Sequence, residues 1–257
     1  MKKFFKIAYC LLVYLFLYAP IVVIIWYSFN DSKRSLLWHG FTWKWYEELV
    51  HDVPLLIVAL HSLTIGILSA TLATILGTLI STALTKYKFL GKRTLYTTSF
   101  MLVITPDIVL GIALLMIYSF FAIPLGFWSL LLAHTTFCLP FVIIIVYSRL
   151  KSLNKNLFEA AKDLGARDSI IFFRVLVPQL LPSLIASWLI SFTLSLDDVI
   201  ISYFVSGPTF EILPLKIYSL ARMGVSPELN ALCTVLFLVT LCMVIISQLI
   251  TRGRKCD

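Results

Sequence analysis

Three aspartates, Asp107, Asp197 and Asp198, lie inside long apolar stretches of this 257-residue sequence. A carboxylate near the centre of a bilayer costs about 2.5–3.5 kcal/mol on insertion scales, so acids in such places usually serve a function. At about 1.5 Å per helical residue, Asp107 lies about 21 Å beyond Arg93, and Asp197 lies about 22 Å beyond Pro182. The spacing therefore predicts carboxylates at a similar depth on two helices.

Carboxylates at one level on two helices favour a cation site or gate on a path across the membrane. On a regular helix Asp197 and Asp198 would be about 100° apart, so one of them is expected to face the path. Ser195 is assigned to the same path. Three alternatives remain open for the acids: an ion pair with a partner subunit, a helix break at an outer cavity, and a proton relay.

Other side chains with possible chemistry give weaker signals. The indole of Trp45 suits a cation, although an interfacial aromatic belt explains its polar, aromatic surroundings more simply. His134 stands alone in an apolar stretch and is expected to be hydrogen-bonded. The five cysteines form no C-x-x-C pair and the four histidines show no ligand spacing, so we predict neither a metal site nor catalytic residues. No G-x-x-x-x-G-K-[ST] motif is present to bind a nucleotide.

The elements that must position these residues are membrane helices. Hydrophobic residues make up 60% of the chain and charged residues 13%, whereas soluble domains have about 25% charged residues. We expect an all-α, polytopic protein with a single membrane domain over residues 1–257. Six spans are predicted, at about 9–27, 63–84, 96–121, 128–147, 182–204 and 231–250.

The basic residues predict the orientation of these spans. Of the 21 lysines and arginines, 16 lie at the two ends, after the second span and between the fourth and fifth spans, while 5 lie in the other loops. Cytoplasmic loops carry such an excess, so both termini are expected in the cytoplasm. The charges flank apolar stretches, which indicates contact with lipid and argues against nucleic acid as the cause of the net charge of +8.

The second span has small residues at every fourth position: Ser69, Ala73, Gly77 and Ser81. Small side chains on one helix face allow another helix to approach closely. The pattern indicates packing and no chemistry.

A charged stretch, EAAKDLGARDSIIFFRVLVP, lies between the fourth and fifth spans at residues 159–178. It predicts two short helices. The first starts after Asn154 or Asn156 and ends at Gly165. The second follows Asp168 as N-cap and ends before Pro178, because the residue before a proline avoids the helical conformation.

This stretch resembles the EAA loop of bacterial ABC-importer permeases, which contains a coupling helix that docks on an ATPase subunit. The resemblance implies a cytoplasmic coupling loop at about 150–178. Its coupling residues would be Glu159, Ala160, Ala161, Asp163, Gly165 and Pro178.

The segments TPDIVLGIALL, SFTLSLDDVIISYFVSGPTFEILPLKIYS and GVSPELNAL resemble the C-type permease subunits of bacterial spermidine/putrescine importers. The likeness implies a heterodimer with a second permease, an ATPase dimer that uses ATP and Mg, and a periplasmic polyamine-binding protein, all at the bacterial inner membrane. Aspartates and aromatic faces would replace the hydration of a polyamine. A permease for another small cation and a self-contained, cation-coupled secondary transporter are the alternatives, although no inverted repeat is evident.

Overall fold

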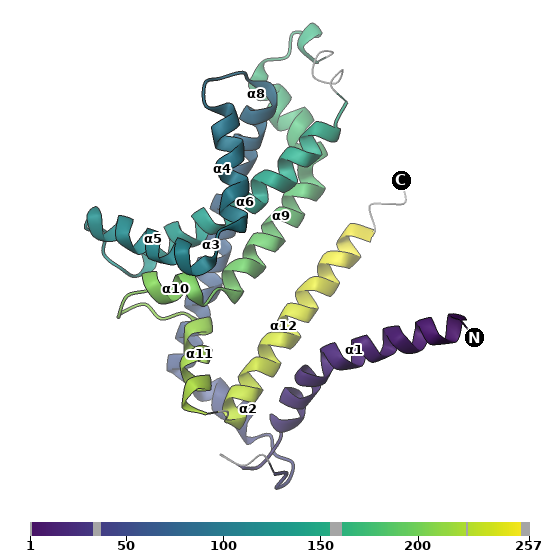
Figure 1. Cartoon of the computed structure of the whole chain (residues 1–257), viewed down its shortest axis with the longest axis vertical. Helices are drawn as coiled ribbons and strands as arrows, with labels where there is room; N and C mark the ends of the chain where they lie inside the picture. The colour runs from purple at the N-terminus through teal and green to yellow at the C-terminus, as the bar shows by residue number, and fades with distance from the viewer. Residues whose placement is uncertain (1, 33–36, 155–160, 225, 253–257) are drawn as a thin grey trace. The chain divides into compact units, whose positions relative to one another are not determined.

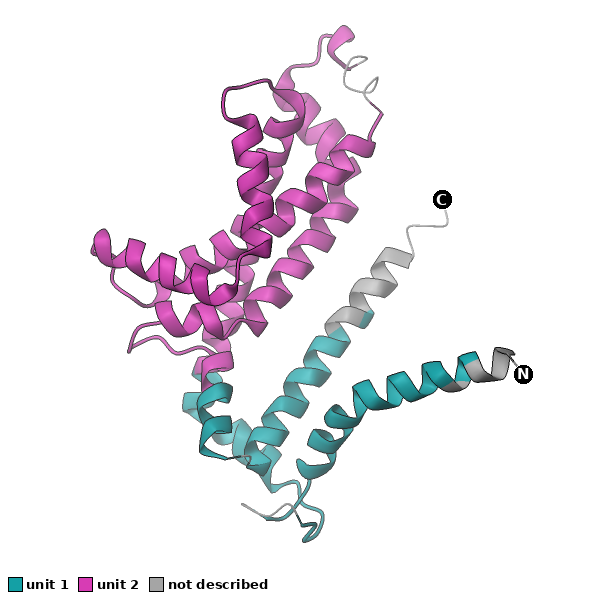
Figure 2. Ribbon diagram, viewed as in Figure 1, with its two compact units in different colours: residues 1–57, 217–257 teal, residues 58–216 magenta. Residues whose placement is uncertain are grey.

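The computed structural model describes residues 2–32, 37–154, 161–224 and 226–252 (Figure 1). Over these residues the chain is helical and has no strand, apart from one isolated bridge between Asn30 and Phe41. Two compact units are distinguished, residues 1–57 with 217–257 and residues 58–216 (Figure 2). The single membrane domain stays a prediction.

The helices keep the labels of Figure 1. They are α1 (Lys2–Tyr27), α2 (Lys44–His51), α3 (Val53–Lys86), α4 (Lys92–Ile104), α5 (Asp107–Phe120), α6 (Phe127–Ser152), α8 (Asp168–Ile170), the π-helix η1 (Ile171–Leu176), α9 (Val177–Asp197), α10 (Ile200–Val205), α11 (Leu213–Met223) and α12 (Pro227–Arg252). The all-helical class is therefore confirmed over the described residues.

Four of these segments are long and apolar enough to cross a membrane: Tyr9–Tyr27, α3, α6 and the continuous stretch Asp168–Asp197. The pair α4 and α5 would make a fifth span if both helices are taken together, and Pro227–Cys242 is a shorter apolar helix. The count of six spans stays a prediction.

The third predicted span is broken. The axes of α4 and α5 differ by 118°. Thr105 has an extended backbone (φ −66°, ψ 130°), which is the conformation favoured before a proline, and the helix restarts at Asp107 after Pro106. The span predicted over 96–121 is thus divided into two helices, because Pro106 ends the first half.

The fifth predicted span also differs from the structure. The helix begins at Asp168 as its first residue and continues through the π-helix to α9, with Pro178 in the first turn of α9. The predicted end before Pro178 was wrong, because wide π turns just ahead of the proline accommodate its missing amide. The helix then ends at Asp197, and α10 restarts at Ile200. One regular helix over 182–204 was therefore also wrong.

In the larger unit, α3 packs against α6 through the small-residue face that its spacing predicted. Ser69, Ala73 and Ser81 are fully buried. A Cβ on Gly77 would come within 2.6 Å of the Val142 side chain, and the Ser81 hydroxyl donates a hydrogen bond of 3.1 Å to the carbonyl of Ile143. The close approach predicted from this pattern is confirmed.

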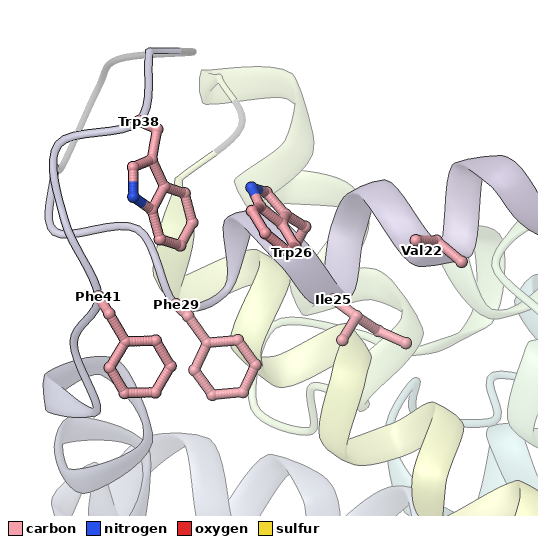
Figure 3. Close-up of a pocket in the computed structure, with 6 residues that line it drawn as sticks. All are labelled: Val22, Ile25, Trp26, Phe29, Trp38 and Phe41. Atoms are coloured by element: carbon pink, nitrogen blue, oxygen red, sulfur yellow. The ribbon is translucent and has the colours of Figure 1, made fainter.

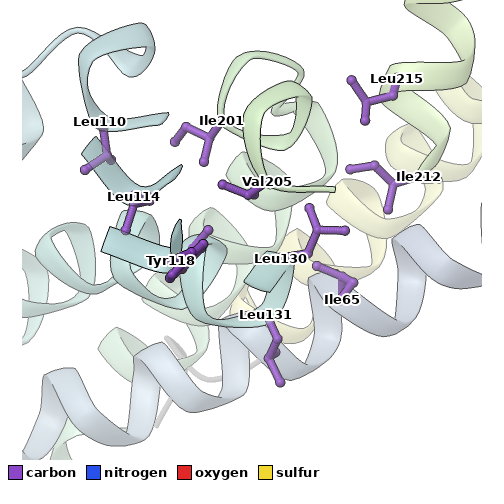
Figure 4. Packing of buried hydrophobic residues seen from close by; sticks show 11 residues of the cluster. Ile65, Leu110, Leu114, Tyr118, Leu130, Leu131, Ile201, Val205, Ile212 and Leu215 are labelled. Carbon is purple, nitrogen blue, oxygen red and sulfur yellow. The ribbon is translucent and has the colours of Figure 1, made fainter. Parts of the chain in front are cut away.

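The halves that follow the two helix breaks pack against each other. Leu110 and Leu114 of α5 face Ile201 and Val205 of α10 in one hydrophobic cluster (Figure 4). A Cβ on Gly111 would lie 3.3 Å from the Cα of Ile201, so the helix backbones approach closely here. This apolar contact stabilises α5 and α10, two short helices that are each separated by a break from the helix before them.

The smaller unit contains an aromatic cluster at the end of α1. The rings of Phe29 and Phe41 stack with centroids 5.2 Å apart, and those of Trp26 and Trp38 lie 5.1 Å apart. Together with Val22 and Ile25 they line an apolar cavity of about 400 Å³ (Figure 3). The described residues that line it are all apolar or aromatic, so only ring faces could contact a cation there.

Candidate functional site

His134 is the centre of a buried polar cluster in the larger unit. Its side chain on α6 is 1% exposed. The ring atom Nδ1 lies 2.6 Å from the hydroxyl of Ser195 on α9, and Nε2 lies 2.9 Å from the hydroxyl of Ser202 on α10. The prediction that this histidine is hydrogen-bonded is confirmed, and its partners come from both sides of the break in the fifth span.

Asp198 completes the cluster at the break itself. One carboxylate oxygen accepts the amide of Ile201 at 3.1 Å. The other accepts the amide and the hydroxyl of Ser202, both at 2.8 Å, and lies 3.6 Å from His134 Nε2. The carboxylate therefore caps the first turn of α10, where free amides favour a negative charge.

One arrangement of protons satisfies every member of this cluster. Ser202 donates its only hydroxyl proton to Asp198, so its oxygen accepts from Nε2–H of His134. Nδ1 then accepts from Ser195, whose oxygen accepts a bond of 3.2 Å from Ser69 on α3. A neutral imidazole thus links four helices, and the cluster stabilises their relative positions.

Asp107 and Asp197 lie in different surroundings. Asp107 is the first residue of α5 and Asp197 the last residue of α9, and both are exposed. Within the described part of the chain, neither carboxylate forms an ion pair. Each flanks one of the two helix breaks, and α5 packs on α10, which follows the second break. Exposed, unpaired carboxylates can bind a cation.

Of the predicted path residues, the structure thus exposes Asp107 and Asp197 and buries Asp198 and Ser195. Ser195 is 3% exposed and serves His134. Ser69 and Ser202 were not predicted as members of any site. Ser202 follows Asp198 by four residues, and an aspartate just ahead of an apolar helical stretch is a signal for a helix start.

Trp45 belongs to the smaller unit and is 2% exposed. Its indole N–H donates a hydrogen bond of 2.8 Å to the carbonyl of Asn30. The Asn30 side chain in turn accepts from the amide of His39 and donates to the carbonyl of Leu37. These contacts give Trp45 a structural role in holding the loop after α1. The ammonium of Lys44 already lies 5.6 Å from the centroid of its ring.

The predicted coupling residues lie partly outside the described residues, since Glu159 and Ala160 belong to the undescribed range 155–160. Ala161 and Asp163 are helical. Gly165 has a left-handed backbone, φ +77°, and donates its amide to the carbonyl of Lys162 at 2.8 Å, while Ala166 donates to Ala161 at 3.1 Å. This pair of bonds is a Schellman motif, so the predicted helix end at Gly165 is confirmed.

Comparison with known proteins identifies the family of this chain. Residues 63–253 match the model of the family described as "Binding-protein-dependent transport system inner membrane component". The chain belongs to this family. Its members are transporter components of the inner membrane, in agreement with the apolar helices described above.

Several curated relatives in this permease family are close. The spermidine/putrescine transport system permease protein PotC of Escherichia coli K12 is 50% identical over 94% of this chain and 92% of its own. PotC of Haemophilus influenzae is 47% identical over 98% of both chains. The putrescine transport system permease protein PotI of Escherichia coli K12 is 40% identical over 90% of this chain and 85% of its own.

Solved structures give the same fold. A chain of a bacterial ABC transporter that imports the acidic polysaccharide alginate superposes with a TM-score of 0.73 at 17% identity, over 98% of this chain and 97% of that one. The methionine ABC transporter MetNI superposes with a TM-score of 0.64 at 19% identity, over 78% and 96%. At these identities the likeness concerns the fold alone.

Proposed function

We propose that this chain is the membrane-spanning permease subunit of an ATP-driven importer that moves spermidine and putrescine from the periplasm to the cytoplasm. The observation that carries the proposal is the 50% identity, over 94% of the chain, to a spermidine/putrescine permease. The exposed carboxylates at two helix breaks agree with a multivalent cationic substrate.

In this proposal Asp107 and Asp197 contact the polyamine as it crosses. Each is exposed at a helix end and has no ion-pair partner in the described chain. Asp198, Ser195 and His134 act indirectly, because their polar atoms are already satisfied by one another. They position the break beside which Asp197 lies. Trp45 has a structural role only.

The partners follow from the family of importers. A second permease would complete a heterodimer, an ATPase dimer would bind ATP and Mg and perform the hydrolysis, and a periplasmic protein would deliver the polyamine. The chain would cross the membrane six times with both termini in the cytoplasm. The segment from Glu159 to Pro178 would then lie on the side of the ATPase, with Ala160, Ala161 and Asp163 in the coupling helix and Gly165 ending it.

Uptake of labelled spermidine and putrescine tests the proposal. The chain would be expressed with its partner subunits in cells that lack their own polyamine importers. We expect saturable uptake that requires a functional ATPase. Polyamine uptake by vesicles that contain this chain alone, driven by an ion gradient, would instead indicate a secondary transporter. Uptake of another small cation in place of the polyamines would show that the proposed substrate is wrong.

A further inference from the structure

A basic cavity in the larger unit lies at the polar ends of three helices, α3, α4 and α6. Its volume is about 590 Å³. It is bounded by the end of α3, the start of α4 and the end of α6. The described residues that line it are Thr82, Leu84, Thr85, Lys86, Tyr87, Lys92, Tyr147, Leu150, Lys151, Leu153, Lys162, Asp168 and Leu176. Three of these residues, Lys162, Asp168 and Leu176, belong to the charged stretch at 159–178.

The lining is strongly positive. It contains four lysines, Lys86, Lys92, Lys151 and Lys162, and one acid, Asp168. The acid lies 3.9 Å from the ammonium of Lys86 and 4.0 Å from that of Lys162, at the outer limit of an ion pair. Among the described lining residues the positive charges thus outnumber the negative ones, and an anion in the cavity would be attracted.

Two of the lysines are held in place by neighbouring groups of the cavity. The ammonium of Lys92 donates a hydrogen bond of 3.1 Å to the carbonyl of Tyr87. That of Lys151 lies 4.8 Å from the ring centroid of Tyr147, a cation–π contact. An ammonium group has three donors, so both side chains keep donors for a further acceptor.

A second cavity of about 570 Å³, lined by apolar side chains together with Lys92, Arg93 and Thr94, lies directly beside the basic one. The two share Leu84, Lys92 and Tyr147. The second cavity is otherwise lined in part by large apolar side chains such as Phe89 and Leu90, and the Leu90 side chain is fully exposed. A basic cavity next to an exposed apolar surface matches a ligand that carries both an anion and acyl chains.

We propose that this pair of cavities binds an anionic phospholipid, with its phosphate among the four lysines and an acyl chain along Phe89 and Leu90. The position supports a lipid, because Lys86 ends the apolar helix α3 and Lys92 begins α4, so both lie at the ends of apolar helices. Basic pockets between the ends of membrane helices bind such headgroups. A soluble phosphate would gain nothing from the apolar side chains of the second cavity.

Native mass spectrometry of the full chain tests the proposal, with phosphatidylglycerol and phosphatidylcholine of identical acyl chains as probes. We expect phosphatidylglycerol to be retained more strongly. Each lysine near a membrane surface contributes about 1 kcal/mol, or about fivefold. Lys86→Gln or Lys151→Gln should lower its occupancy about fivefold, and the double variant about thirtyfold.

Lys88→Gln is the matched control. Lys88 lies two residues from Lys86, is exposed and lines neither cavity, so its replacement should leave lipid occupancy unchanged. Because Lys86 contacts Asp168, the exposed Lys151 gives a second variant that should leave the fold intact. Equal losses in Lys88→Gln and Lys151→Gln would overturn the proposal.

Two further results would also overturn the lipid assignment. Displacement of phosphatidylglycerol by millimolar inorganic phosphate would indicate a site for soluble anions. Loss of the lipid on assembly with the ATPase would indicate that acidic groups of that partner occupy the cavity. We expect the lipid to resist phosphate and to remain bound in the assembled complex.

Discussion

Asp197 and Asp198 are neighbours in sequence but lie in two different environments. Asp197 ends α9 and is exposed, whereas Asp198 is 7% exposed and accepts three hydrogen bonds at the start of α10. The exposed acids beside the breaks are free to meet a cation, and the buried cluster around His134 holds the second break in place. In the function proposed here, a helix break therefore separates a transport role from a structural role within two residues.

The largest effect is expected from removal of the buried carboxylate. Asp198→Ala would leave two backbone amides and the hydroxyl of Ser202 without their acceptor. Each buried, unsatisfied donor costs about 1–3 kcal/mol, so the free energy of unfolding should fall by about 3 kcal/mol or more. Unfolding of the purified chain in mixed micelles, followed by tryptophan fluorescence, measures this loss.

Asp197→Ala is the matched control for that measurement, one residue away. Its exposed carboxylate has no hydrogen-bond or ion-pair partner among the described residues, so stability should stay within about 0.5 kcal/mol of the unchanged chain. Equal destabilisation by both variants would contradict the conclusion that Asp198, but not Asp197, stabilises the fold.

The next effect concerns His134. His134→Phe keeps a ring of similar size but removes both hydrogen bonds, leaving the hydroxyls of Ser195 and Ser202 with one partner fewer. We expect a loss of about 2 kcal/mol in the same unfolding assay. Thr135→Val serves as control, because this buried hydroxyl donates only to the carbonyl of Leu131 in its own helix, and it should cost less than half as much. A larger loss of stability in Thr135→Val than in His134→Phe would contradict the central role of His134 in the cluster.

On the exposed side of the comparison, Asp107→Asn should lower polyamine uptake at least tenfold while stability and assembly stay unchanged. The amide keeps the shape of the side chain, but the charge that would replace part of the hydration of the cation is lost. Asp107→Glu should be partly tolerated. Uptake at matched expression, with the amount of co-purified partner subunits, checks both variants. Loss of partner subunits would indicate a structural ion pair instead.

A smaller effect on stability is expected at Gly165, which ends the coupling helix with a positive φ. Gly165→Val should cost about 1 kcal/mol through backbone strain alone, since no atom lies within 4 Å of the position of a Cβ. Gly91→Val carries the same strain at φ +88° with equally open surroundings. If the coupling assignment is correct, only the Gly165 variant loses uptake. Equal uptake in both variants would contradict it.

The sequence predicted those features that depend on local patterns. The spacing of Ser69, Ala73 and Gly77 predicted a close helix contact, which α3 makes with α6 at Gly77. Gly165 predicted the end of its helix. Both signals act within one or two helical turns, where the chemistry of a small residue or a left-handed glycine decides the outcome.

The cluster around His134 could not be predicted in the same way. Its partners Ser195 and Ser202 lie on opposite sides of a break, whereas the apolar stretch of 23 residues at 182–204 predicts a single span. The signal was Asp198 itself, because an aspartate that accepts the amides two to four residues ahead starts a helix. Pro106 is a local signal for the break between α4 and α5. The bend of 118° is accompanied by packing of α5 against α10, and this contact between distant segments cannot be predicted from a local pattern.

The uptake rate per assembled complex of Asp197→Asn and Asp198→Asn, measured side by side, tests the central claim most directly. We predict that Asp197→Asn assembles normally and transports at least tenfold more slowly. Asp198→Asn should yield less complex, but each remaining complex should transport at a rate close to that of the unchanged chain. Normal transport by Asp197→Asn, together with a tenfold slower rate per complex in Asp198→Asn, would contradict the division of roles between the exposed and the buried aspartate.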